Sequence, residues 1–145
     1  MQIQQKETSP ISKSVIESYF SSINQEKFNL TADLFTEEGT LLAPFEKPII
    51  GRKAIASYLE KEAKGMELIP LKEVYETEEN TSRVTITGKV KTSLFSVNVA
   101  WHFELNSKDR ITTAKIKLIA SPQELLGLQK SKEKSIESSQ DELKQ

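Results

Sequence analysis

The stretch from Leu34 to Ile55 constrains the fold of this chain more than any other part of its sequence. A predicted helix ends at Leu34–Phe35, and Gly39 then turns the chain into a short strand over residues 40–42. Two prolines bracket the loop that follows, and Gly51 releases the backbone into a new helix. This order of helix, turn, strand, loop and helix predicts a domain that mixes helices with a sheet.

Apolar residues recur at helical spacing in three segments of the N-terminal half. The first helix is predicted to start at Ser9-Pro10, a capping side chain followed by proline at the first helical position, and it carries Tyr19. The second spans about 28–35. The third spans about 52–64 and stops at Gly65, which tolerates the left-handed conformation beyond a helix end.

The remainder of the chain alternates apolar and polar residues, which predicts strands over 66–75, 82–91, 93–105 and 111–119. Pro70 indicates a sheet edge or a bulge, and Gly88 indicates a bulge. The alternation is clearest over 93–105, and one face there carries Phe95, Val97, Val99, Trp101, Phe103 and Leu105. Helices first and a meander afterwards predict an α+β fold with an antiparallel sheet.

The two ends of the chain differ from its middle. We expect a flexible N-terminus over 1–9, a single domain over 10–129 that ends in a short helix at 122–128, and a tail over 130–145. The tail has mixed charges and almost no apolar residues, so burial cannot offset its ordering entropy and we expect it to be disordered.

Composition argues against several functions. A net charge of −1 and the lack of a polybasic run argue against partners such as nucleic acid or an anionic membrane surface. The chain has no cysteine and one histidine, His102, whereas a metal site needs several converging ligands. No apolar run reaches the length of a membrane span. We therefore expect a cytoplasmic protein without a bound metal.

The order described above, preceded by the helix that carries Tyr19, resembles the nuclear transport factor 2-like superfamily, which includes ketosteroid isomerases and SnoaL-type cyclases. The resemblance covers about 12–128. It implies a cone in which three N-terminal helices pack on a curved antiparallel sheet, with a short C-terminal helix. In that fold, function lies in the few side chains that line the cone.

Isomerases of this superfamily combine a tyrosine donor, a carboxylate base and a protonated aspartate. The resemblance places Tyr19, Ala43 and Trp101 at or near these positions. Alanine cannot take a proton and an indole only donates, so the sequence leans against such an enzyme. Glu46 or His102 stays open as another base for a SnoaL-like enzyme. A ligand-free dimerisation module, with both aromatics packed in the core, also stays open.

Six segments resemble a narrower family, the C-terminal domain of the cyanobacterial orange carotenoid protein and its stand-alone homologues. They are 43–45, 48–51, 68–70, 87–90, 98–103 and 118–126, and the last contains the specific sequence Ala-Ser-Pro-Gln-Glu-Leu-Leu. Those proteins hold a keto-carotenoid by hydrogen bonds from a tyrosine and a tryptophan, and Tyr19 and Trp101 fall on those positions. The resemblance also implies a homodimer through the outer face of the sheet.

From these patterns we predict non-enzymatic binding, as a carrier or in photoprotection, of an apolar ligand with a carbonyl group. A keto-carotenoid is the specific candidate. Tyr19 and Trp101 are the predicted hydrogen-bond donors, since each buried polar tip requires an acceptor. The predicted apolar walls are Phe95, Val97, Val99, Phe103, Leu41, Phe45 and Ile55.

Overall fold

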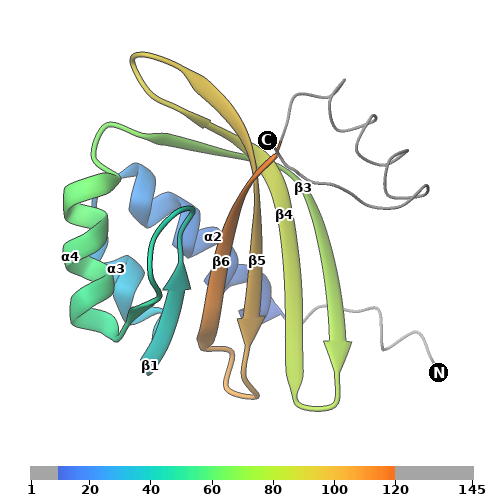
Figure 1. Ribbon diagram of the computed structural model, residues 1–145. Helices are drawn as coiled ribbons and strands as arrows, with labels where there is room; N and C mark the ends of the chain where they lie inside the picture. Colours follow the sequence, from blue (N-terminus) through green and yellow to red (C-terminus); the bar gives the residue numbers. More distant parts are fainter. Residues whose placement is uncertain (1–9, 120–145) are drawn as a thin grey trace.

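The computed structural model describes residues 10–119, which form an α+β domain with a curved sheet, as predicted (Figure 1). The helices are α2 (Pro10–Asn24), α3 (Phe28–Asp33) and α4 (Arg52–Glu62). The strands are β1 (Phe35–Leu42), β2 (Ile49–Ile50), β3 (Glu67–Glu78), β4 (Thr81–Lys91), β5 (Ser96–Leu105) and β6 (Ile111–Ile119). The predicted N-terminal segment, the helix at 122–128 and the tail at 130–145 lie outside the described residues.

The six strands form one sheet in the order β2-β1-β6-β5-β4-β3. All neighbouring pairs are antiparallel except β1 and β6, which run parallel. This exception to the predicted antiparallel sheet arises where Phe35 pairs with Ile111, and the Ile111 amide donates to the Leu34 carbonyl oxygen at 3.0 Å. Figure 1 shows the helices gathered on one side of the sheet. Within residues 10–119, no helix combines the length and apolarity needed to cross a membrane.

Several predicted boundaries shift because strand pairing overrides local sequence signals. Phe35 was predicted to end a helix but begins β1, where it is buried opposite β6. Gly39 was predicted as a turn but lies within β1, at an irregularity in the pairing with β6. The strand predicted to end at residue 75 continues to Glu78 against β4, which leaves a turn of only Glu79–Asn80.

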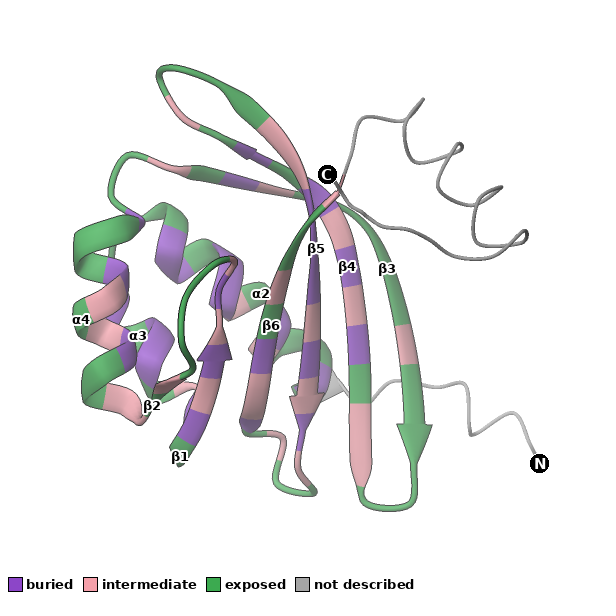
Figure 2. Ribbon diagram, in the orientation of Figure 1, coloured by how far each residue is buried: buried purple, intermediate pink, exposed green. Residues whose placement is uncertain are grey.

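The core lies between the inner face of the sheet and the helices (Figure 2). The apolar stripe of α2 places Tyr19 and Phe20 against β5. The Tyr19 ring meets Phe103 edge to face at a centroid distance of 4.8 Å, and the Phe20 ring meets Trp101 in the same way at 4.7 Å. Two consecutive residues of one helix therefore fasten α2 to one strand.

Strand β3 is an edge strand and carries a bulge next to Pro70, in agreement with the signal read from that proline. Gly88 of β4 lies opposite Pro70 of β3. The extra residue is in β3, so the bulge predicted at Gly88 lies in the neighbouring strand instead. A Cβ atom on Gly88 would lie 2.0 Å from the carbonyl oxygen of Ile69. The glycine is required here for the close approach of two backbones.

We expect Gly88→Ala to destabilise the fold by about 3 kcal/mol, because the added methyl group meets backbone that cannot move aside. Gly65→Ala is the matched control, because a Cβ atom there meets no atom within 4 Å. The only cost is that alanine is strained at the φ of +82° that this position has. The control should cost about 1 kcal/mol. Urea unfolding measures both values, and equal losses would contradict this explanation.

His102 lies on the outer face of the sheet, opposite in direction to Trp101. Its Nδ1 atom is 3.3 Å from the Thr85 hydroxyl. Burial, followed by the positive charges of Lys117 and Lys115, lowers the pKa of His102 below its ordinary value. The imidazole is therefore neutral at neutral pH.

This lowered pKa predicts that the protein loses stability as the pH falls below about 6.5, the ordinary pKa of histidine. In that range the unfolded chain binds a proton that the folded chain resists, so acid favours unfolding. The urea concentration at half-unfolding should fall between about pH 7.5 and about pH 5.5, the range in which histidine normally titrates. In His102→Gln this fall should be smaller than in the wild type. An identical pH dependence in both proteins would refute this assignment.

Candidate functional site

A cavity of about 460 Å³ lies between the inner face of the sheet, α2 and α4. Its walls are largely apolar, with a few polar groups. The residues that line it are Tyr19, Ile23, Ala43, Pro44, Phe45, Glu46, Tyr58, Leu59, Glu62, Ala63, Met66, Leu68, Val90, Phe95, Val97, Val99, Trp101, Ile116 and Leu118.

Tyr19 and Trp101 reach this cavity from different elements, α2 and β5. Each side chain is only 1% exposed. Within residues 10–119, neither the phenol hydroxyl nor the indole N–H forms a hydrogen bond with another protein group. Burial, with a smaller contribution from Tyr58, raises the pKa of Tyr19 well above its ordinary value, so the phenol keeps its proton. The site therefore holds two buried donors without protein acceptors.

The aromatic contacts between α2 and β5 hold these donors in place. Phe20 packs on the Trp101 ring, while Phe103 packs on the Tyr19 ring. Both rings are thus packed against aromatic neighbours, while their polar atoms have no protein partner within residues 10–119. Such an arrangement is preorganised to bind a hydrogen-bond acceptor in apolar surroundings.

The structure brings together six of the residues predicted for the site and separates three. Those that line the cavity are Tyr19, Trp101, Phe45, Phe95, Val97 and Val99. Phe103, Leu41 and Ile55 do not line it and are fully buried in the core. Phe103 in particular is covered by the Tyr19 ring. The ligand-binding role of all nine residues stays a prediction.

One edge of the cavity carries exposed apolar side chains. Phe45 is 94% exposed, has a φ of +65°, and lies in the loop after β1. Phe95 and Leu118 are also exposed and belong to the cavity lining. Phe95 precedes β5, which starts three residues later than the predicted strand. These side chains form an apolar rim that we call the mouth of the cavity.

From α4, the sequence analysis predicted only Ile55 and missed the residues of that helix that do line the cavity. Tyr58, Leu59, Glu62 and Ala63 all line the cavity and are spaced as one face of a helix. The spacing was a usable signal, but a glutamate on a polar helix is typical of a solvent-exposed face. The missed residues on β6, Ile116 and Leu118, follow from strand alternation.

The structure locates both residues that stayed open as another base, Glu46 and His102. Ala43, which the resemblance places at the isomerase base position, lines the cavity, and His102 faces the other side of the sheet. Glu46, the other candidate base, does line the cavity, and Glu62 joins it from α4. Carboxylates are therefore present at the cavity, although not at the predicted catalytic position.

Comparisons with known proteins agree with this architecture. The nuclear transport factor 2 (NTF2) domain family matches residues 11–113. The orange carotenoid-binding protein of Limnospira maxima is 36% identical over 123 residues, which are 81% of this chain and 39% of that protein. Its counterpart in Synechocystis sp. is 34% identical over 121 residues, or 80% of this chain and 38% of that protein.

A solved structure gives the same result. The orange carotenoid protein of Anabaena (Nostoc) sp. PCC 7120 binding canthaxanthin aligns with a TM-score of 0.72 at 36% identity, over 79% of this chain and 39% of that one. This chain therefore spans about two-fifths of the length of these relatives. On the match of its sequence and of its helices and curved sheet, the chain belongs to the NTF2 domain family and is similar to the C-terminal domain of orange carotenoid proteins.

Proposed function

We propose that this protein is a cytoplasmic, non-enzymatic carrier of an apolar ligand that bears a carbonyl group, specifically a keto-carotenoid. The observation that carries the proposal is the pair of buried donors, Tyr19 and Trp101, on one apolar cavity. The similarity to carotenoid-binding proteins supports the same class of ligand.

The energetics of the two donors favour a carbonyl acceptor. A buried donor without a partner costs about 1–3 kcal/mol, so Tyr19 and Trp101 together leave a substantial free energy available to a ligand. A carbonyl oxygen has two lone pairs and can accept a hydrogen bond from each donor. One ligand atom placed between them would therefore satisfy both groups.

The size of the cavity supports a ligand that is only partly enclosed. A volume of about 460 Å³ suits a ring with part of a chain, and a long polyene would continue through the mouth past Phe45, Phe95 and Leu118. Apolar side chains exposed at that edge can cover the emerging part of the ligand.

A catalytic alternative rests on one specific observation. Glu46 and Glu62 line the same cavity as Tyr19, so a carboxylate base and a phenol donor share one site. That combination is suited to proton transfer next to a carbonyl group. Conversion of a bound ketone into an isomer, detected by chromatography, would favour this SnoaL-like activity over a carrier.

We expect Tyr19→Phe and Trp101→Phe each to weaken binding of canthaxanthin about tenfold, the loss of one hydrogen bond of about 1.4 kcal/mol. The two losses should add, so the double variant should bind about a hundredfold more weakly and lose the red-shifted band at pigment concentrations that saturate the wild type. The measurement is the red-shifted absorption band of the pigment, followed in co-expression and by titration. Tyr75→Phe is the matched control, because Tyr75 is a partly buried tyrosine of β3 outside the cavity lining.

Two outcomes would contradict the carrier. Folded wild-type protein that stays colourless after incubation with the pigment would refute the proposed carrier function. An unchanged band in the double variant would remove the role of the two donors.

The proposal includes a homodimer through the outer face of the sheet. Val74 is 47% exposed and points outward, since it pairs with Thr85 beside His102. Leu71, at the bulge of the same strand, is also exposed. Together these side chains give the outer face apolar area at the edge strand, where a second copy would cover it.

Light scattering should therefore give about twice the chain mass of 16.4 kDa. Val74→Glu should shift the mass towards the monomer, because it places a charge in the dimer interface. Leu30→Glu, at an exposed position on α3, is the control and should leave the mass unchanged. A monomer at every concentration would rule out the dimer.

A further inference from the structure

One carbonyl group accounts for Tyr19 and Trp101 but leaves three polar side chains of the cavity without a role. These are Glu46, Tyr58 and Glu62, and all three belong to the cavity lining. Tyr58 and Glu62 are four residues apart on α4 and share one face of that helix. Glu46 comes from the loop between β1 and β2, so two separate elements supply the group.

The electrostatics link these side chains to one another and to the deep donor. Burial, followed by the negative charges of Glu46 and Glu62, raises the pKa of Tyr58 above its ordinary value. Tyr58 in turn contributes to the raised pKa of Tyr19. The phenol of Tyr58 thus lies within electrostatic reach of both the buried donor and the two carboxylates.

The three polar groups are not paired with one another. In the region from 10 to 119, no hydrogen bond connects the Tyr58 hydroxyl with either carboxylate, and neither carboxylate forms a salt bridge. A carboxylate only accepts hydrogen bonds, whereas Tyr19 and Trp101 act as donors here. Glu46 and Glu62 are exposed and Tyr58 is partly buried, so the acceptors lie on the solvent side of the cavity, whereas the donors Tyr19 and Trp101 lie in its buried part.

Resting on the carrier function proposed above, we infer that Glu46, Tyr58 and Glu62 form a subsite for a hydroxyl group of the ligand. The preferred ligand carries this hydroxyl on the same end ring as the carbonyl group that Tyr19 and Trp101 bind. Its hydroxyl proton is donated to a carboxylate of the subsite, and its oxygen accepts from Tyr58. This assignment narrows the ligand from ketones in general to hydroxyketones.

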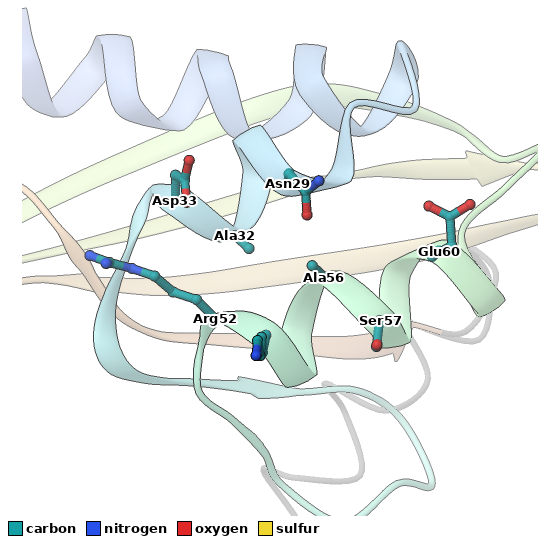
Figure 3. Close-up of a pocket in the computed structure, with 8 residues that line it drawn as sticks. Asn29, Ala32, Asp33, Arg52, Ala56, Ser57 and Glu60 are labelled. Carbon is teal, nitrogen blue, oxygen red and sulfur yellow. The ribbon is translucent and has the colours of Figure 1, made fainter.

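A second charged hollow lies between α3 and α4 (Figure 3). Arg52 lines that hollow, but its Nε already donates to the Phe35 carbonyl oxygen at 2.9 Å. Glu60 also lines it and forms a salt bridge of 2.8 Å with Lys64. Because the Glu60 carboxylate already has a protein partner, this residue is a matched control position on the same helix as Glu62.

The test compares two pigments that differ only in the hydroxyl group. The full chain is titrated with canthaxanthin and with the same diketone carrying a hydroxyl beside each carbonyl. We expect the wild-type protein to bind the hydroxylated pigment about tenfold more tightly, the effect of one hydrogen bond to a charged group. Tyr58→Phe and the double variant Glu46→Gln/Glu62→Gln should each reduce this preference to about twofold or less. The readout is the ratio of the two affinities within each protein, so a variant that weakens both pigments equally does not count as a loss of preference.

Glu60→Gln is the control, because it removes a carboxylate of α4 outside the cavity, and it should keep the full preference. Equal wild-type affinities for the two pigments would overturn the subsite and leave the carrier function standing. Variants that keep the wild-type preference would also overturn it. Binding of neither pigment by folded protein would remove both proposals together.

Discussion

The structure depends on the edge-to-face contacts that join α2 to β5. Tyr19 packs on Phe103, and Phe20 packs on Trp101, so two adjacent residues of the helix engage two alternate residues of the strand. Aromatic pairs of this kind contribute about 0.5–1.5 kcal/mol each beyond the burial of their area. They also fix the distance of the helix from the sheet, and that distance decides whether a cavity exists between them.

The same contacts explain how polar groups come to be buried without partners. The rings of Tyr19 and Trp101 belong to the core and also line the cavity, and their hydroxyl and indole N–H have no protein partner within residues 10–119. A fold optimised only for stability would fill this space or supply acceptors, since unpaired buried donors are costly. The cost is understandable if a ligand completes the hydrogen bonds, and this links the packing of the core to the proposed function.

Sequence patterns predicted which face of the sheet a side chain points to, but not whether that side chain lines the cavity or lies in the solid core. Strand alternation placed Val99, Trp101 and Phe103 on one face of β5, and all three do point inward, because the pleat fixes the period. Alternation contains no information about position along the strand relative to a helix, so it did not separate the cavity residue Trp101 from the core residue Phe103. That separation depends on where Tyr19 docks, which is a tertiary contact. Glu62 was missed for a related reason, since its helix is polar and only the fold shows that one face borders a cavity.

The charge of the cavity restricts the ligand as much as its shape does. Among residues 10–119, the side chains that line the cavity include the carboxylates Glu46 and Glu62 but no lysine, arginine or histidine. An apolar molecule with a carboxylate head, such as a fatty acid, would meet like charges there and find no cation to pair with. A neutral carbonyl group needs no counter-ion, and two buried donors are sufficient to hold it. In the proposed subsite, the same carboxylates that repel an acid would accept a hydroxyl proton, so one arrangement would disfavour charged lipids and favour neutral hydroxyketones. On this proposal, selectivity depends on which hydrogen-bonding groups have no protein partner, while the apolar walls supply affinity for any ligand of suitable shape.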